Sequence, residues 1–389
     1  MDCYIVTGQQ HILNVINIKL NFFKDSDAEC HIFNCFSNAH TYYLNLLEEK
    51  TVFSNIYFHD INIDKIYKYP FDINSKNSKL KNRIKYAIRS FFPSVGKKDY
   101  INTCLYLKDY NNIFIAGDMQ YLSVFLLYNI NKKRNIYFYS DGLSDYVSCR
   151  EKISKKQKLL SFFGFKTIKN NIKGLYYYSP SAMIHKTKIP TIELGNLPDY
   201  SLPILKRIFN YSDYADEMKT NRIIFATAPF DNKNEVPTIL HDQMTFYAEQ
   251  QIEVSEHLNK LFPNNFAIRK HPASKIEYGD KKIMKAKTLF EVEVLMNDVS
   301  SHVFISPFSS IAFLPKFIFD KEPYIIFLYK LMKIDVDKFM SISNETLSKF
   351  IFDNLTNRYS DSRKIIIPET YEELDNFLFE YKRKHDIGQ

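Results

Sequence analysis

The segment RIIFATAPFD, residues 222–231, points to the fold class of this chain. It begins with a short apolar run, which is typical of a strand buried on both faces of a sheet. A helical pattern follows over residues 244–261, and further strands are predicted at 266–269, 303–306 and 324–327. Strands that alternate with helices in this way predict a parallel sheet covered by helices.

The N-terminal half of the chain repeats this alternation. Strands are predicted at 3–6, 31–36, 55–58, 113–116 and 136–139, and helices at 38–47, at 121–128 and around the apolar positions Ile12, Val15, Ile16 and Leu20. A chain of 389 residues is longer than one hydrophobic core usually supports. We therefore expect an α/β fold with two Rossmann-like domains, 1–195 and 215–389, that face a central cleft.

The connection between the two halves and the end of the chain carry their own signals. The stretch 176–216 lacks a clear period and contains 4 prolines, so we interpret it as the crossover between the domains. A final helix is predicted over 370–383, directly after Pro368, and its acidic first turn suits the positive end of a helix. We expect this helix to close the C-terminal domain.

Composition places the chain among folded globular proteins, with 45% apolar and 25% charged residues. Only 9 glycines are present, and neither a G-x-G-x-x-G nor a Walker-type loop occurs. The 5 cysteines have no C-x-x-C or zinc-site spacing, which indicates free thiols in a reducing compartment. We find no signal-peptide pattern and no apolar run long enough to span a bilayer, so a cytoplasmic location is expected.

Residues that end a strand are the first candidates for a site, because ligands of parallel sheets bind beyond the carboxyl ends of the strands. In the N-terminal half these are Thr7 and Gly8 after the first strand, and Ser140-Asp141-Gly142 after the strand at 136–139. Gly142 permits a tight turn, and the Asp141 carboxylate would face the cleft. The alternative is an ordinary turn, since Asp-Gly is a common turn pair.

The segment Arg269-Lys270-His271-Pro272 follows the strand at 266–269. Proline keeps the residue before it extended and lacks an N–H, so His271 is expected to point out of the sheet. A histidine there can donate a hydrogen bond to a nucleotide phosphate and help that phosphate to leave. The alternative is a surface histidine in a basic turn.

The segment Ser306-Pro307-Phe308-Ser309-Ser310 joins the strand at 303–306 to a helix that begins near residue 311. Hydroxyls and backbone N–H groups at the start of a helix form an anion site. Serine is also a favoured N-cap residue, so simple capping explains Ser309 and Ser310 without any ligand.

The order of these segments is more specific than any one of them. An acidic residue before glycine, then His-Pro, then Ser-Ser resembles the signature of bacterial sialyltransferases, which include lipooligosaccharide sialyltransferases and capsular polysialyltransferases. Thr7-Gly8-Gln9-Gln10 also resembles the lipooligosaccharide group. The resemblance implies a GT-B fold with an acceptor-side N-terminal domain and a nucleotide-sugar-binding C-terminal domain. It also implies CMP-sialic acid as donor, inversion at the anomeric carbon, and neither a metal nor another cofactor.

The chain departs from the family pattern at Ser140, where several of these families have the acidic residue that acts as general base. Serine cannot take the acceptor's proton at neutral pH unaided. The base is then Asp141 in a shifted geometry, or it comes from elsewhere. Asp231, after Ala228-Pro229-Phe230, resembles the aspartate proposed as base in lipooligosaccharide sialyltransferases. The other interpretation of Asp231 is a loop or capping residue.

The implied reaction moves sialic acid to a terminal sugar of a bacterial surface glycan, either lipooligosaccharide or capsule. An aspartate would deprotonate the acceptor hydroxyl while His271, Ser309 and Ser310 stabilise the departing phosphate. The expected partners are the nucleotide-sugar donor and a glycan or glycolipid acceptor. Basic stretches with aromatic residues at 79–98 and 152–173 suggest peripheral contact with the anionic inner membrane, and solvated lysine faces explain them equally well.

Three other functions stay open from the sequence. The first is a related GT-B transferase that uses a hexose nucleotide or CMP-Kdo, and the second is a protein that binds a nucleotide sugar without catalysis. The net charge of +8 also allows a nucleic-acid partner, but no recognised motif supports one. Asp335-Val336-Asp337 resembles a D-x-D metal motif of another architecture but lies beyond the serine segment, so no metal role is expected. His11, His59 and His257 are expected to be structural or solvent-facing.

Overall fold

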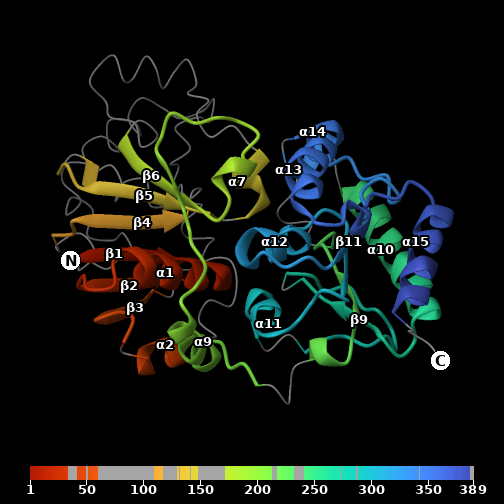
Figure 1. The fold of residues 1–389 in the computed structure, drawn as a ribbon, viewed down its shortest axis with the longest axis horizontal. Helices are drawn as coiled ribbons and strands as arrows, with labels where there is room; N and C mark the ends of the chain where they lie inside the picture. Colours follow the sequence, from red (N-terminus) through yellow and green to blue (C-terminus); the bar gives the residue numbers. More distant parts are fainter. Residues whose placement is uncertain are drawn as a thin grey trace. The chain divides into compact units, whose positions relative to one another are not determined.

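The computed structural model describes residues 1–33, 42–49, 51–59, 109–116, 129–130, 132–140, 142–147, 171–212, 217–231, 241–271, 273–285, 288–340 and 342–385. It divides the chain into two compact units. Unit 1 comprises Met1–Asp145, Cys149–Ser181 and His185–Ile208, and unit 2 comprises Tyr146–Ser148, Ala182–Ile184 and Phe209–Gln389. Each unit is built around its own parallel sheet (Figure 1).

Unit 1 contains a seven-stranded sheet in the order β3-β2-β1-β4-β5-β6-β7, in which every neighbouring pair is parallel. Its strands are β1 (Asp2–Val6), β2 (Ala28–Phe33), β3 (Asn55–His59), β4 (Asn112–Ala116), β5 (Asn135–Tyr139), β6 (Ile172–Tyr177) and β7 (Thr191–Glu193). The described α-helices of unit 1 are α1 (Gln9–Phe22), α2 (Tyr43–Glu48) and α9 (Leu202–Ile208), and α7 (Leu143–Val147) is divided between the two units after Asp145. All residues of β1 are buried, as an apolar strand with neighbours on both edges requires.

Unit 2 contains a five-stranded parallel sheet in the order β12-β11-β10-β8-β9. Its strands are β8 (Ile223–Ala226), β9 (Phe266–Arg269), β10 (Val303–Ser306), β11 (Tyr324–Phe327) and β12 (Ile365–Ile366). Its helices are α10 (His241–Leu261), α11 (Phe290–Met296), α12 (Leu314–Phe319), α13 (Asp337–Met340), α14 (Asn344–Phe350) and α15 (Tyr371–Lys384).

These two parallel sheets confirm the predicted fold class. The strands predicted at 266–269, 303–306 and 324–327 coincide with β9, β10 and β11. The predicted helix at 121–128 and residues 34–36 and 38–41 of other predicted elements lie outside the described residues. The elements that were not predicted include the 2-residue strand β12 and also β6, which has 6 residues.

The C-terminal helix α15 forms close to its predicted position. The Thr370 hydroxyl accepts a hydrogen bond from the backbone N–H of Glu373 at 3.2 Å, and the Glu373 carboxylate accepts one from the N–H of Glu369 at 2.7 Å. These bonds cap the first turn and fix where the helix begins. The Tyr381 hydroxyl donates to the carbonyl of Ser301 at 2.5 Å, so α15 packs on the sheet of unit 2.

The stretch 176–216 contains the passage from unit 1 to unit 2 and also forms regular elements that were not predicted. This stretch completes β6 and adds β7 and α9 to unit 1, and the chain enters the main body of unit 2 after Ile208. Its prolines lie at the ends of these elements, where a missing N–H costs no ladder bond. Pro190, for example, precedes β7, and its carbonyl accepts a hydrogen bond from Leu175 of β6 at 2.9 Å.

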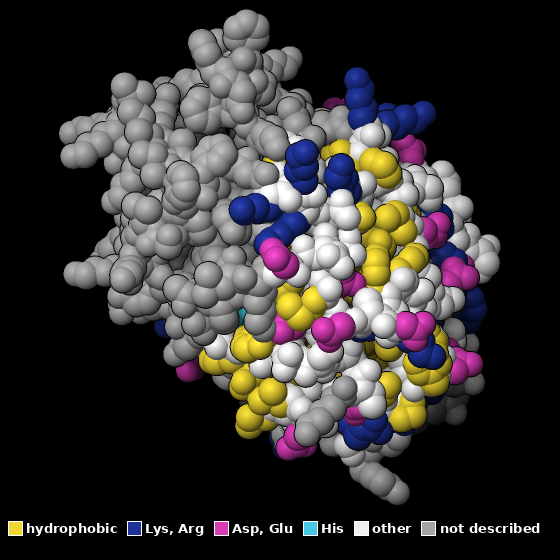
Figure 2. All heavy atoms as spheres, turned by 90° about the vertical axis from the view of Figure 1, so that its left-hand side faces the viewer, with side chains coloured by type: hydrophobic (Ala, Val, Ile, Leu, Met, Phe, Trp, Pro, Cys, Tyr) yellow, Lys and Arg dark blue, Asp and Glu magenta, His cyan; other side chains and the backbone are white. Residues whose placement is uncertain are grey.

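The sequence predicts a chain without membrane-spanning helices that contacts a membrane through basic stretches. No helix in the described ranges is both long and apolar enough to cross a bilayer. Residues 79–98 and 152–170 of the two basic stretches lie outside the described residues. On the face drawn in Figure 2, Lys and Arg side chains gather toward the top of the described part, with acidic and apolar side chains interspersed below them. Contact with an anionic membrane stays a prediction.

Candidate functional site at the carboxyl edge of the second sheet

Three neighbouring strands of unit 2 bring most of the predicted residues together. Strands β9, β8 and β10 are adjacent and parallel, with Ala226 of β8 beside Arg269 of β9 and Phe225 of β8 beside Ile305 of β10. Their carboxyl ends therefore meet at one edge of the sheet. Thr227, His271 and the serine segment 306–310 follow these three strands, so they share the edge at which ligands of parallel sheets bind.

Thr227 fixes the backbone at His271. The His271 N–H donates to the Thr227 hydroxyl at 2.9 Å, and the Thr227 N–H donates to the Arg269 carbonyl at 3.1 Å. The Thr227 side chain is buried, whereas His271 is exposed. Thr227 was not among the predicted site residues. Its position directly after a strand is the signal that could have identified it.

The hydrogen bonds of His271 define its tautomer. The backbone N–H of Ala273 donates to Nδ1 of His271 at 3.1 Å. Nδ1 therefore carries a lone pair, and in the neutral ring the proton is on Nε2. His271 can thus offer an N–H donor to an anionic ligand. The Arg269 guanidinium is bound by the Glu293 carboxylate and by the Thr288 carbonyl at 2.8 Å, so it is not directed to the ligand edge. Pro272 lies outside the described residues.

The serine segment forms a turn that is held by its own hydroxyls. The Ser306 hydroxyl accepts a hydrogen bond from the Ser309 N–H at 3.1 Å, and the Ser309 hydroxyl accepts one from the Ile311 N–H at 3.4 Å. Ser309 is thus the N-cap of the 3₁₀ turn Ser310–Ala312, as the capping interpretation requires. A hydroxyl that accepts a bond still has its own O–H to donate. Capping and anion binding are therefore compatible, and Ser310 lies half-buried beside them.

Asp231 lies in the same group of loops. One carboxylate oxygen, Oδ2, accepts a hydrogen bond from the N–H of Lys275, in the loop that follows His271. The other oxygen, Oδ1, is buried and has no hydrogen-bond partner among the described residues. Because Oδ1 is buried, a substrate hydroxyl can reach it only if this loop shifts.

A buried glutamine supports the loop that carries Asp231. Gln251 of α10 accepts a hydrogen bond from the Ala228 N–H at 2.7 Å, and its amide donates to the Ala228 carbonyl at 3.2 Å and to the Tyr278 hydroxyl at 2.7 Å. Burial raises the pKa of Tyr278 to about 12, and the hydrogen bonds from Thr227 and Gln251 oppose that rise. Gln251 was also missed, because a polar residue within an amphipathic helix gives no sequence signal of its own. Tyr278, in the loop after His271, was missed as well.

The remaining predicted residues belong to unit 1. The Thr7 hydroxyl lies 3.0 Å from Nδ1 of His11, at the carboxyl end of β1. The Ser140 carbonyl, at the end of β5, accepts a hydrogen bond from the Asn14 amide at 2.7 Å. These contacts hold the start of α1 against the ends of the strands. Asp141 lies outside the described residues.

The two glycines of this group lie at strand ends in unit 1. Gly8 precedes α1 as its N-cap in extended backbone, and Gly142 has φ 130, a conformation that other residues rarely adopt. His11 is buried rather than solvent-facing. His59 is buried as well, and His257 pairs with Asp375 at 2.6 Å.

Among the described residues, no group of three or more His, Cys, Asp or Glu side chains is placed so that it could hold a metal ion. Asp335 of the D-x-D sequence forms an ion pair with Lys338 at 3.3 Å. Independence from metal stays a prediction.

No protein-family model matches the chain, and no curated protein matches it in sequence. Solved structures do match its fold. One is UDP-GlcNAc 2-epimerase of Methanocaldococcus jannaschii in complex with UDP-GlcNAc and UDP, with 12% identity and a TM-score of 0.51 over 98% of this chain and 92% of that one. Another is Staphylococcus aureus MnaA with UDP, at 12% identity and TM-score 0.45, covering 98% of this chain and 96% of that chain. A third is Arabidopsis thaliana UGT89C1 complexed with UDP-L-rhamnose, at 11% identity and TM-score 0.46, covering 99% and 90% of the two chains.

The first of these similarities, together with the two sheets, establishes the class of fold. The chain has the GT-B architecture of two Rossmann-like α/β domains. At 12% identity the similarity is evidence of fold alone. Many functions share such a fold, so the activity must be argued from the site.

Proposed function

We propose that this protein is an inverting glycosyltransferase that binds the phosphate of a nucleotide-sugar donor at the carboxyl edge of the second sheet. One observation carries the proposal: Thr227, His271 and the turn of Ser306 and Ser309 follow three adjacent parallel strands. This arrangement supplies an N–H donor on a fixed backbone and several hydroxyl donors around one edge. Such donors stabilise negative charge that develops on a leaving phosphate.

The donor that we propose is CMP-sialic acid. The proposal rests on the order of the acidic-Gly, His-Pro and Ser-Ser segments, and two of these segments lie at the edge described above. The acceptor would be a terminal sugar of a bacterial surface glycan, and the enzyme would work in the cytoplasm or at the inner membrane. We expect the reaction to need no metal.

The proposed reaction is a displacement at the anomeric carbon. The acceptor hydroxyl oxygen forms a bond to that carbon while the bond from the carbon to the phosphate oxygen of CMP breaks. The electron pair of the broken bond leaves with CMP, where His271 Nε2–H and the serine hydroxyls bind it. An aspartate carboxylate, Asp231 or Asp141, takes the proton of the hydroxyl. Attack opposite to the leaving group inverts the configuration.

A second donor class has its own support. The M. jannaschii epimerase, which shares the fold at a TM-score of 0.51, was solved with UDP-GlcNAc and UDP. A UDP-sugar would use the same phosphate donors and would differ at the base and the sugar. Under this alternative the enzyme transfers a hexose or a related sugar rather than sialic acid.

Thermal unfolding in the presence of nucleotides tests the proposal. We expect CMP to raise the melting temperature of the protein, with the same shift in chelator, and UDP and GDP to have little effect. A His271→Ala variant should lose most of the shift because it lacks the ring N–H. A shift with UDP or GDP would redirect the enzyme to hexose transfer. The absence of any shift would overturn the proposed function.

A further inference from the structure

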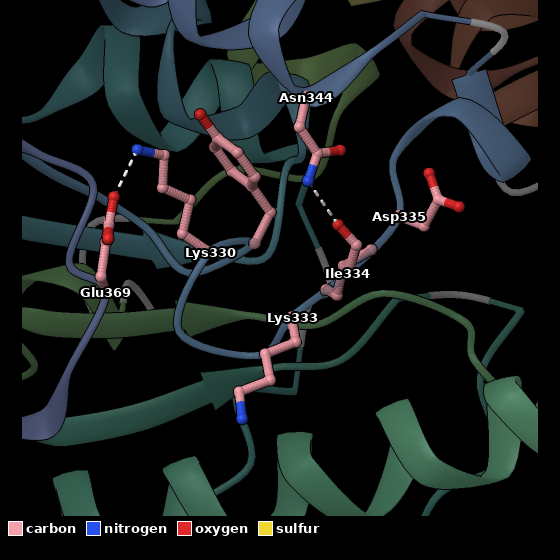
Figure 3. A pocket seen from close by; sticks show the side chains of 7 residues that line it. Lys330, Lys333, Ile334, Asp335, Asn344 and Glu369 are labelled. Atoms are coloured by element: carbon pink, nitrogen blue, oxygen red, sulfur yellow. Dashed lines mark hydrogen bonds and ion pairs between the residues drawn. The ribbon is translucent and has the colours of Figure 1, made fainter.

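A pocket opens along the same sheet edge, on the other side of β10 from β8 and β9. Its volume is about 460 Å³. The Leu328 N–H donates to the Ser306 carbonyl at 2.9 Å, so the chain that leaves β11 begins beside the serine turn. The next residues, Tyr329 and Lys330, line the pocket, and Glu369, which follows β12, closes one side (Figure 3).

Most of the pocket wall is arranged before any ligand binds. Lys330 Nζ lies 2.6 Å from the Glu369 carboxylate. The Asn344 amide donates to the Ile334 carbonyl and accepts from the Val336 N–H, both at 2.8 Å. In Figure 3 the ion pair stands on one side, and Asn344 and Asp335 stand on the other. Such a wall offers fixed donors and acceptors at several points, which is the pattern that a ligand with many hydroxyls requires.

Lys333 is the uncommitted cation of this pocket. It lines the pocket, its side chain is exposed, and within the described ranges it has no ion pair or side-chain hydrogen bond. Its neighbours of opposite charge are engaged elsewhere: Asp335 pairs with Lys338 at 3.3 Å, and Glu369 pairs with Lys330. Lys333 also has φ 53, a left-handed conformation that a lysine adopts only where the surrounding turn imposes it. A ligand with one negative charge would therefore find Lys333 available.

Aromatic side chains connect the pocket to the phosphate edge. The backbone N–H of Asp335 donates to the Tyr247 hydroxyl at 3.3 Å. The Tyr247 ring lies 5.5 Å from Phe230, the residue before Asp231, and Phe230 lies 6.1 Å from Phe308 in the serine turn. Phe230 and Tyr247 are buried, so these contacts join the pocket wall and the serine turn through the packed core of unit 2.

We infer that this pocket binds the sugar of the donor and that the sugar is acidic, with its carboxylate at Lys333 and its hydroxyls at Asp335, Asn344 and Glu369. The inference rests on the proposed function, which places the donor phosphate at the serine turn. Five of the seven lining residues carry a charge or a side-chain amide, which suits the hydroxyls and the carboxylate of such a sugar.

Calorimetric titration of the intact protein with CMP and with CMP-sialic acid tests the inference. The wild type should bind CMP-sialic acid more tightly than CMP. A Lys333→Asn variant keeps a residue that tolerates the left-handed backbone but removes the charge. It should bind CMP-sialic acid about tenfold more weakly, since a charge-assisted hydrogen bond is lost, and CMP as well as before. Lys133→Asn is the matched control, because Lys133 is an exposed lysine at φ 60 in unit 1. It should change neither affinity.

The outcomes separate this inference from the proposed function. If CMP binds but the sialic acid adds no affinity, or if the added affinity survives in Lys333→Asn, the pocket is not the acidic-sugar subsite and the donor-phosphate site stands. A UDP-sugar could also bind in place of CMP-sialic acid. If Lys333→Asn leaves its affinity unchanged, the inference that the donor sugar is acidic is wrong. If neither CMP nor any other nucleotide binds, the proposed function fails, and this inference fails with it.

Discussion

The hydroxyl of Thr227 accepts a hydrogen bond from the backbone N–H of His271 at 2.9 Å, across 44 positions of sequence. This bond ties the end of β8 to the turn after β9. It fixes the backbone of His271, and the Ala273 N–H fixes which ring nitrogen carries the proton. The geometry of the candidate phosphate site therefore depends on Thr227, which is not part of the His-Pro or Ser-Ser segments.

Removal of the Thr227 hydroxyl should weaken both the fold and the site. Thr227→Val keeps the shape of the side chain but leaves the His271 N–H without its acceptor, so we expect a loss of about 1 kcal/mol in the free energy of unfolding. Catalytic turnover should fall more than the loss in stability would explain. Thr227→Ser, which keeps the hydroxyl, serves as control. Denaturant unfolding and kinetic assays of the two variants check this, and equal behaviour of both variants would contradict it.

Replacement of His271 should act on the departure of the leaving group. We expect His271→Ala to lower kcat on the order of a hundredfold or more, because a positioned proton or hydrogen-bond donor contributes that much to such a step. The KM for the acceptor should change little. Near-normal turnover by His271→Ala, measured as release of CMP, would exclude a role at the phosphate.

The general base can be assigned by a pair of variants. Asp231→Asn and Asp141→Asn each remove one carboxylate with almost no change in size. The variant that lacks the base should lose on the order of a hundredfold or more in kcat, while the other keeps activity within a few-fold. Oδ1 of Asp231 has no hydrogen-bond partner within the described ranges and Asp141 lies outside them, so the two variants are needed to decide between these carboxylates. Full activity in both variants would show that the base is neither of them.

Gln251 should be important for stability. Its side chain is fully buried and satisfies Ala228 at both backbone groups and the Tyr278 hydroxyl. Gln251→Leu would leave these groups unpaired, which should cost about 3 kcal/mol in the free energy of unfolding. The matched control is Gln250→Leu, one position earlier, because the Gln250 amide donates to the Glu253 carboxylate at 3.0 Å in an exposed hydrogen bond. A small effect of Gln251→Leu would show that water replaces the lost partners.

His59 should make the stability of unit 1 depend on pH. Burial, and next the proximity of His31, lower the pKa of His59 to about 4. Nδ1 of His31 lies 3.0 Å from Nε2 of His59, and both rings are buried. An unfolded histidine binds a proton near pH 6.5, so the unfolded state binds more protons between about pH 6.5 and 4. The free energy of unfolding should therefore fall in this window as pH is lowered, by about 3 kcal/mol from this residue.

Denaturant unfolding at a series of pH values checks this expectation. His59→Gln removes the titrating ring and should flatten the fall between pH 6.5 and 4 relative to the wild type. Above about pH 7 the histidine is neutral in both states, so the wild type should show no slope from this residue there. An equally steep fall in His59→Gln would assign the acid sensitivity to other groups.

Local sequence patterns were sufficient for the strands and helices that are long or strongly apolar. The bounds of β9, β10 and β11 followed from short apolar runs bounded by polar or turn residues, and α15 from Thr370 and the acidic residues behind it. The same reasoning failed between 176 and 216. There β7 has only 3 residues and prolines punctuate the chain, so pairing with β6, which no local pattern encodes, decides the structure.

The sequence by itself determined the two-domain α/β class and named the His-Pro and Ser-Ser segments, because periodicity and residue type are local properties. Only the tertiary structure decided that His271, the serine turn and Asp231 lie at one edge of one sheet. Thr227 binds the backbone of His271, and Asp231 binds the backbone of Lys275, each across 44 positions of sequence. The tertiary structure alone disclosed Gln251 and the pocket at Lys333. Strand order and long-range hydrogen bonds depend on how the whole chain packs, so they cannot be predicted from a single segment of the sequence.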